Sequence, residues 1–467
     1  MTAPPPSRPE PSVPAREKLG LGLGFAASQG ATNVVYVLSH QVLNVMFGLN
    51  PALVTLIGAA QRIWNALLDP VFGRLSDNLR GPLGRRRPLL LAAIVPLAAS
   101  FVAMWWFPRG WGGLRLFAYS LAASLLLYTA ISLYSSALGG LQVEAASGYH
   151  ERTRVAAFMQ LCFLAFTVAA QWVFPLIQGF ADPVRGLREL ALGAGLFFLA
   201  AGLAPVWLAR DRLYAWVAAR QGRLRFGERL RAARRNPPLL RLLAADGAMS
   251  LGFYLSSALG FYLNYYYIYA GDVKAAAVMQ GVLGTAFQLA AFGSVVAFRQ
   301  LSFRIGKRRA FQLAAACHFA GAAAKLWLFR PEHPSWQIFA YLASGAAYAA
   351  TEMFSLSMLA DVVDLDELRT GVRSEALHWS LLSWVDKLGG AAGTLLSGLL
   401  LVAVGFDSRL GGAQSARCLL LMRVLYAACP AGGALAAIAL LARFPVTESS
   451  ARAVRDELDL RRAAAAG

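Results

Sequence analysis

The stretch RIWNALLDPVFGRLSD, residues 62–77, lies in an apolar run that is long enough to cross a lipid bilayer. It nevertheless carries three polar side chains, those of Arg62, Asn65 and Asp69. Polar and charged side chains inside a membrane are costly, and they are kept where they bind something or pair with one another. The stretch therefore predicts a transmembrane helix with one polar face.

The composition of the whole chain is typical of an integral membrane protein. Its 467 residues are 57% hydrophobic and 15% charged, and the mean hydropathy is +0.51. The net charge of +19 does not indicate a nucleic-acid partner, because the arginines fall between apolar runs and form no contiguous basic domain. The four cysteines are scattered through apolar segments, so they indicate neither a disulfide framework nor a metal site.

Twelve segments are apolar over the roughly 20 residues that a spanning helix needs. They are residues 20–47, 51–75, 88–107, 114–143, 155–178, 189–209, 239–268, 274–298, 309–329, 336–360, 376–403 and 418–443. Basic loops follow the second, fourth, sixth and eighth segments, among them RGPLGRRRP, HERTR and RIGKRR. By the positive-inside rule, both termini are expected in the cytoplasm, with the chain in the cytoplasmic (inner) membrane.

An internal repeat divides the chain into two halves. GRLSDNLRGPLGRRRP follows the second segment, and FRQLSFRIGKRRA lies about 220 residues later, after the eighth. Two six-helix repeats are typical of a transporter with its substrate site near the membrane midplane. We expect an all-α membrane protein of two six-helix bundles, 19–209 and 239–443, with a disordered tail 1–18, a basic central loop 210–238 and a cytoplasmic tail 444–467.

The polar residues of the second segment share one helical stripe. At 100° per residue the stripe contains Gly58, Arg62, Asn65, Asp69 and Gly73. The opposite face, with Trp64, Leu67 and Val71, is expected to meet lipid. Arg62 and Asp69 either stabilise the packing of neighbouring helices or take part in the protein's function. In the second case Asp69 binds a cation or a proton.

Segment eleven has a similar polar face. Its members are Ser380, Ser383, Lys387, Thr394 and Gly398. Lys387 is either a counter-ion for Asp69 or a substrate or proton ligand. Asp386 points about 100° away from this face. Asp246, Glu352 and Arg423 also lie in apolar segments, and we expect each of them to belong to an ion pair.

Several of these stretches resemble the major facilitator superfamily, and within it the glycoside–pentoside–hexuronide:cation symporter family, which includes melibiose permease. The resemblance rests on RIWNALLDPVFGRLSD, GRRRP, HERTR, NPPLLRLL and SMLADVVDLDELRTGVRSEA, which together span most of the chain. It implies a symporter that alternates access by rocking two six-helix bundles. In that family, carboxylates of the second helix and a threonine of the fourth bind the coupling cation. A lysine of the eleventh helix lies near both the sugar site and the cation site.

Carried over by this resemblance, the cation site consists of Asp69, Thr129 and Lys387, with Asn65 where the family has a second carboxylate. Na⁺ prefers several hard oxygen ligands, whereas one carboxylate suffices for H⁺. The resemblance therefore favours H⁺ as the coupling ion, with Na⁺ as the alternative, and no other cofactor.

The substrate side departs further from the family pattern. Gln29 and Ser132 stand where melibiose permease has sugar-binding acids, Met159 aligns with an arginine and Ser136 with a tryptophan. The expected cavity residues are Gln29, Arg62, Tyr128, Ser132, Ser136, Met159, Ser383 and Lys387. A galactoside held by paired carboxylates is disfavoured, which leaves another sugar or glycoside, or a lysolipid.

The loop that contains GRLSD and GRRRP predicts a cytoplasmic gate, in which its arginines reach carboxylates of the other half. Its expected members are Gly73, Asp77, Gly84, Arg85, Arg86, Arg87, Asp361, Asp364 and Arg373. The leading hypothesis is an H⁺-coupled sugar or glycoside symporter that works as a monomer. An uncoupled facilitator or lysolipid transporter, a Na⁺ symporter and a non-transporting sensor stay open. The sequence has no nucleophile–base pair, metal cluster or phosphate loop to indicate an enzyme.

Overall fold

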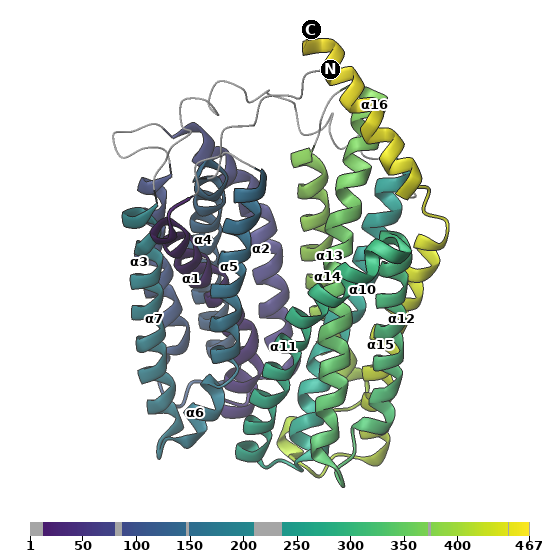
Figure 1. The fold of residues 1–467 in the computed structure, drawn as a ribbon. Helices are drawn as coiled ribbons and strands as arrows, with labels where there is room; N and C mark the ends of the chain where they lie inside the picture. Colours follow the sequence, from purple (N-terminus) through teal and green to yellow (C-terminus); the bar gives the residue numbers. More distant parts are fainter. Residues whose placement is uncertain are drawn as a thin grey trace. The chain divides into compact units, whose positions relative to one another are not determined.

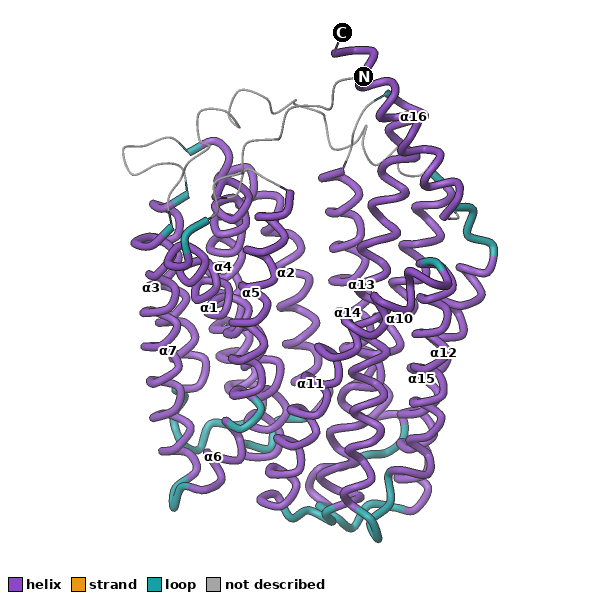
Figure 2. Tube along the Cα trace, in the orientation of Figure 1, coloured by secondary structure: helices purple, strands orange, loops and turns teal. Residues whose placement is uncertain are grey.

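The computed structural model describes residues 13–79, 86–145, 149–209, 236–371, 375–446 and 448–466, and these residues form helices and loops without a strand (Figure 2). Each of the twelve predicted spans coincides with a helix (Figure 1). In the first half these helices are α1 (Ala15–Ser39) with η1 (His40–Met46), α2 (Pro51–Asn78), α3 (Arg87–Trp105), α4 (Gly113–Ala145), α5 (Tyr149–Ala170) with α6 (Val173–Gly179), and α7 (Pro183–Leu208).

The second half contains the corresponding helices. They are α10 (Pro237–Tyr262) with η2 (Leu263–Ile268), α11 (Val273–Ile305), α12 (Lys307–Leu328), α13 (Gln337–Thr370), α14 (Glu375–Ala403) and α15 (Ala416–Ala442). Short 3₁₀ turns occur at η3 (Pro334–Trp336) and η4 (Ser408–Leu410), and α16 (Glu448–Ala466) follows the last span. Among the described residues, eight helices are long and apolar enough by themselves to cross a membrane; α1, α2, α12 and α13 are less apolar.

The chain divides into two compact units. Unit 1 comprises Met1–Leu38 and Trp64–Gly222, and unit 2 comprises Ser39–Ile63 and Arg223–Gly467. The predicted bundles end in different places from these units, since η1 and the first half of α2 group with unit 2. The boundary passes through α2 between Ile63 and Trp64, that is, inside the polar stretch that begins at Arg62.

The core of unit 1 forms where α3 packs against α4 and α7. The rings of Phe101 and Phe198 meet edge to face at 4.9 Å. Gly202 lies against Ile94, and its carbonyl accepts a hydrogen bond of 2.7 Å from the Tyr134 hydroxyl. Interlocking aromatic rings and a glycine at the crossing hold these helices together by close contact, which is the main attraction available between helices in lipid.

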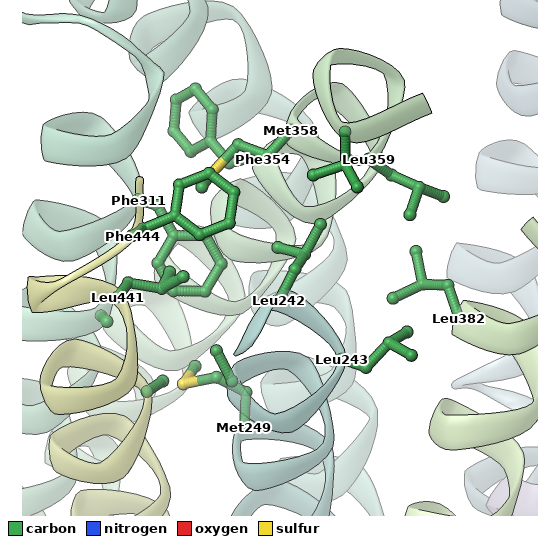
Figure 3. Close-up of a cluster of buried hydrophobic side chains, with 14 of the residues drawn as sticks. Leu242, Leu243, Met249, Phe311, Phe354, Met358, Leu359, Leu382, Leu441 and Phe444 are labelled. Atoms are coloured by element: carbon green, nitrogen blue, oxygen red, sulfur yellow. The ribbon is translucent and has the colours of Figure 1, made fainter. Parts of the chain in front are cut away.

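The core of unit 2 is built from α10, α12, α13, α14 and α15 (Figure 3). Its labelled side chains are Leu242, Leu243, Met249, Phe311, Phe354, Met358, Leu359, Leu382, Leu441 and Phe444. Elsewhere in the unit, glycines let the backbones of two helices approach. Gly252 of α10 lies against Gly433 of α15, and Gly345 of α13 lies against the backbone of Phe287 in α11.

Two pairs of equivalent contacts support the internal repeat. The first spans of the two sequence halves both end in a π-helical turn, η1 and η2. In each turn an asparagine amide donates to a backbone carbonyl, from Asn44 to Leu49 at 2.7 Å and from Asn264 to Ala276 at 3.1 Å. The two asparagines are about 220 residues apart, the same interval as the repeated loop motifs.

The second pair caps helix ends. Arg87, at the start of α3, donates to the carbonyl of Ala209 just after α7 at 2.5 Å. Arg308, at the start of α12, donates in the same way to the carbonyl of Phe444 just after α15 at 3.3 Å. Carbonyls at a helix C-terminus have no partner within the helix, so an arginine there satisfies them. The repeated Arg-Arg motifs thus perform the same structural task in both units.

Both segments predicted as tails contain helical residues. Helix α1 begins at Ala15, inside the segment predicted as a disordered tail. The reason is that the backbone N–H of Val13 and the ammonium of Lys18 both bind the carboxylate of Glu151, at 2.9 and 2.6 Å. The predicted tail 444–467 contains the helix α16. The central loop lies outside the described residues between 209 and 236.

Candidate functional site

Within unit 1, the carboxylate of Asp69 contacts a hydroxyl of α4. Ser132 Oγ donates to Asp69 Oδ1 at 2.7 Å, and Ser132 is fully buried. Asp69 itself is partly exposed. The sequence assigned Asp69 to the cation site and Ser132 to the substrate cavity, and the structure brings these two residues into direct contact.

Thr129, predicted as a cation ligand, lies one turn earlier on α4. Its Oγ1 accepts a hydrogen bond of 2.9 Å from Trp64 Nε1 and donates one of 2.7 Å to the carbonyl of Leu125. Leu67 and Val71 are exposed as the helical stripe predicts. Trp64 is exposed as well, and its indole N–H also reaches across to α4.

The other predicted residues of unit 1 lie on α1, α2, α4 and α5. Tyr128 and Met159 are buried, whereas Gln29, Asn65 and Ser136 are partly exposed. An apolar hollow of about 560 Å³ lies between α3, α4 and α7 instead, and its lining includes none of these residues. Val95, Val102 and Leu192 are among the side chains that line it.

Arg62 belongs to unit 2 and contacts α10 and α14. Its guanidinium lies 4.0 Å from the centre of the Tyr254 ring, which is a cation–π distance. The same guanidinium fills the space beside Gly390, where a Cβ would come within 2.8 Å of Nη1. The two predicted polar faces also meet in this unit, since Gly58 of α2 lies against Thr394 and Thr55 lies against Gly398.

On α14, Ser383 is exposed and Lys387 is partly buried. Asp386 does point away from this face, and its carboxylate accepts a hydrogen bond of 2.8 Å from Ser250 of α10. The ion pairs expected for Asp246 and Glu352 are wrong within the described part of the chain. Both carboxyl groups instead interact with each other and with Asp386.

Arg423 is likewise not in an ion pair between described residues. It donates to the carbonyl of Leu326 at 2.7 Å and lies 5.2 Å from the Tyr267 ring. The sequence reasoning missed a further buried cation, Lys325 of α12, whose ammonium lies 4.0 Å from the ring centre of Tyr426. The sequence does show a lysine within an apolar segment, which could have indicated a buried cation. Its aromatic partner Tyr426 could not be predicted, because it comes from another helix, α15.

The gate residues of unit 1 are held by their own unit. Arg86 is buried, donates to Ser76 Oγ and packs on Gly140. A Cβ at Gly73 would meet no atom within 4 Å in the described part of the protein. Gly84, Arg85 and Arg373 lie outside the described residues, as does the side chain of Asp77.

The gate carboxylates of unit 2 bind cations of the same unit. Asp361 is buried, and it receives Lys307 Nζ at 2.7 Å and Arg455 Nη2 of α16 at 2.7 Å. Arg455 also lies 3.3 Å from Asp364. These carboxylates thus pair with Arg455 of the C-terminal helix α16, which the loop motifs alone do not indicate.

The HERTR motif holds the N-terminus of the chain to α5. Lys18 and Arg154 flank the carboxylate of Glu151, at 2.6 and 3.3 Å. The hydrogen bond from Lys18 in particular holds the pKa of Glu151 below its ordinary value, while desolvation opposes the shift. Glu151 lies just before the membrane-spanning part of α5, so this contact acts at the surface of the unit.

Comparison with known proteins identifies the family. Residues 20–448 match the family described as MFS/sugar transport protein. The chain belongs to this family. An uncharacterized symporter of Synechocystis sp. is 25% identical to it over 95% of this chain and 96% of its own length. A glucuronide carrier protein homolog of Escherichia coli is 25% identical over 86% of each chain.

An isoprimeverose transporter of Lactiplantibacillus pentosus is 26% identical over 92% of this chain and 88% of its own length. Solved structures share the fold at lower identity. A variant of the nucleoside transporter NupG has a TM-score of 0.65 at 12% identity, covering 92% of this chain and all of that one. An inward-facing bacterial homolog of the human lysosomal transporter Spinster has a TM-score of 0.62 at 14% identity, over 95% and 98%.

These matches confirm the predicted fold class and family. The protein has the twelve-helix, two-bundle architecture of the major facilitator superfamily and belongs to its glycoside–pentoside–hexuronide symporter branch. It is a multi-pass membrane transporter and not an enzyme. The polar contacts inside its helices are therefore to be interpreted as parts of a transport mechanism.

Proposed function

We propose that this transporter is an H⁺-coupled symporter for a sugar or glycoside, which alternates access by rocking its two six-helix bundles. The contact between Asp69 and Ser132 carries the proposal, because it places a carboxylate of a membrane helix on a hydroxyl that a substrate or a proton can replace. We further propose that both termini face the cytoplasm and that the monomer in the inner membrane is the working unit.

The ligands around Asp69 favour a proton over Na⁺. Hard cations take several oxygen ligands at once. Asn65 stands one turn before Asp69 where the family has a carboxylate. One of the two lone pairs of Thr129 Oγ1 is engaged by the Trp64 N–H, which leaves this oxygen a weaker ligand. A proton needs one carboxylate only, so it is the coupling ion that this set of side chains suits best.

The neutral polar residues of unit 1 suit a sugar. Gln29, Ser132 and Ser136 offer amide and hydroxyl groups, which exchange hydrogen bonds with sugar hydroxyls at little electrostatic cost. The named relatives include a glucuronide carrier homolog and an isoprimeverose transporter. A sugar or glycoside is therefore the substrate class that we expect, and in unit 2 we propose Arg62, Ser383 and Lys387 as substrate-binding residues.

Reconstitution in liposomes tests the proposal. Vesicles containing the purified protein are loaded with a pH gradient, and uptake of labelled methyl glucuronide and isoprimeverose is followed with and without a Na⁺ gradient. The wild type should accumulate one of them on the pH gradient alone. Asp69→Asn should abolish accumulation, and Asp456→Asn, the same change on the exposed face of α16, should leave it intact.

Asn65→Asp sharpens the choice of ion. It adds the second carboxylate on the same helical stripe, one turn from Asp69, and should make uptake respond to Na⁺. Accumulation by Asp69→Asn at the wild-type level would refute the coupling role. Uptake of both sugars that only equilibrates would instead indicate a facilitator, and uptake of lysophosphatidylcholine in place of the sugars would indicate an amphiphile transporter.

A further inference from the structure

Unit 2 contains three carboxyl groups at membrane depth that come from three different helices. They are Asp246 of α10, Glu352 of α13 and Asp386 of α14. Glu352 interacts electrostatically with both of the others, and Asp246 also interacts with Asp386. Among the described residues of this unit, the ion pairs at Asp361, Asp364 and Asp366 include none of the three. Three negative charges held together in a membrane are costly, and protonation relieves that cost.

Hydroxyl groups connect the carboxyl groups into one network. Ser250 Oγ donates to Asp386 Oδ1 at 2.8 Å. The Tyr348 hydroxyl interacts both with Ser250 and with the carboxyl group of Glu352. A hydroxyl can accept a proton on one side and donate one on the other. The line from Asp386 through Ser250 and Tyr348 to Glu352 therefore offers a route between carboxyl groups of α14 and α13.

Two buried polar side chains beside this network have hydrogen-bonding capacity that is not used. Ser355 is 1% exposed and its side chain faces Asp246, yet among the described residues its Oγ has no partner in full hydrogen-bonding geometry. His318 of α12 is 2% exposed, its ring lies 6.4 Å from the Tyr348 ring, and neither ring nitrogen has a partner in the described part of the chain. Buried polar atoms are ordinarily satisfied, and Ser355 Oγ can accept the hydrogen bond that the carboxyl group of Asp246 donates once it is protonated.

The charges around the network come from several helices. Beside it lie His318 and Lys325 of α12, and Lys387 follows Asp386 on α14. Arg62 of α2 stacks on the ring of Tyr254 of α10, which in turn interacts with Tyr348. Helix α11 has no titratable side chain between Lys274 and Arg299. Within the described residues, no group of three His, Cys, Asp or Glu side chains has the spacing of a metal site. A proton is the ligand that fits these observations.

We propose that Asp246, Glu352 and Asp386 form a proton-binding site in unit 2, separate from Asp69, with Glu352 as the group that gains and loses the proton. Glu352 and Asp386 are partly exposed whereas Asp246 is buried, and Asp386 already accepts a hydrogen bond from Ser250, so Glu352 is the member that we assign to proton exchange. The site does not depend on the sugar or on the role of Asp69. Only its contribution to coupled transport rests on the proposed function.

The first experiment detects the proton without transport. The full-length protein in detergent is treated with dicyclohexylcarbodiimide, which modifies protonated carboxyl groups in apolar surroundings, and the modified residues are located by mass spectrometry from pH 5 to 9. Glu352 should be labelled about tenfold or more above Glu332, an exposed glutamate in a loop of the same unit. Asp386→Asn should move the Glu352 profile to lower pH, because one fewer negative charge makes ionisation of Glu352 easier.

The second experiment asks whether the site takes part in transport. In the liposome assay, Glu352→Gln should reduce accumulation driven by the pH gradient by about tenfold while exchange at equal sugar concentrations continues. Thermal unfolding of Glu352→Gln and Glu352→Asp checks that both variants fold. Labelling of Glu352 no stronger than that of Glu332, or a profile unchanged by Asp386→Asn, would overturn the site. A wild type that accumulates neither sugar would refute the proposed function, while the labelling result would still decide the site.

Discussion

A test of the packing of unit 2 follows from two neighbouring glycines of α15. Gly433 faces α10, where a Cβ would lie 2.5 Å from the carbonyl oxygen of Ala248 and 3.3 Å from the Cα of Gly252. A Cβ at Gly432 would meet no atom within 4 Å in the described part of the chain. Replacing each glycine by alanine therefore adds the same methyl group, once into a helix crossing and once into open space.

The expected difference follows from these distances. Ordinary contact begins at 3.4 Å, so α10 and α15 must separate by about an ångström to admit the methyl group at position 433. Overpacking of this kind costs about 1–3 kcal/mol. Both variants gain up to about 1 kcal/mol, because alanine favours a helix more than glycine does, and this gain cancels between them. The two variants should thus differ by the overpacking cost of about 1–3 kcal/mol.

Thermal unfolding of the purified protein in one detergent measures this difference. A stability change of 1 kcal/mol moves Tm by about 2–4 °C in a unit of this size, so Gly433→Ala should melt about 2–12 °C below Gly432→Ala. Gly252→Ala, which meets the carbonyl of Cys429 from the other side of the same crossing, should behave like Gly433→Ala. Equal melting of Gly433→Ala and Gly432→Ala would refute the close approach of these helices.

Two further predictions concern the surface contacts at the ends of the chain. The hydrogen bond from Lys18 lowers the pKa of Glu151 from its ordinary 4.5, so the contact stabilises the fold above about pH 4.5 and is lost as the pH falls through the lowered value. Glu151→Gln should melt below the wild type at pH 7, and the gap should close in acid; a gap that stays constant with pH would contradict this account. Arg455→Ala removes the contacts of α16 with Asp361 and Asp364, so limited trypsin digestion should cut within 448–466 several-fold faster. Asp456→Ala, on an exposed side chain of the same helix, serves as the control, and equal cutting of the two variants would show that the ion pairs do not hold the helix.

The sequence predicted correctly what depends on one helix at a time. Each of the twelve spans is present, because a segment in lipid must satisfy its backbone hydrogen bonds within itself, and an apolar run of sufficient length therefore becomes a helix. Helical periodicity also identified the exposed face of Leu67 and Val71. The repeated Arg-Arg motifs revealed the duplication that Arg87 and Arg308 display at the ends of α7 and α15.

The partners of the polar side chains depended on the tertiary structure. Asp69 meets Ser132 across two helices, and Asp246, Glu352 and Asp386 converge from three, where ion pairs were expected. Local sequence sets the face on which a side chain lies but not which helix is rotated toward that face. That rotation is decided where backbones approach most closely, as at Gly252 and Gly433, and such contacts join residues far apart in the chain. The polar stretch beginning at Arg62 illustrates both what the sequence determines and what the tertiary structure determines. Its helix is encoded locally, whereas the contacts of Arg62 with Tyr254 and of Asp69 with Ser132 exist only in the folded units.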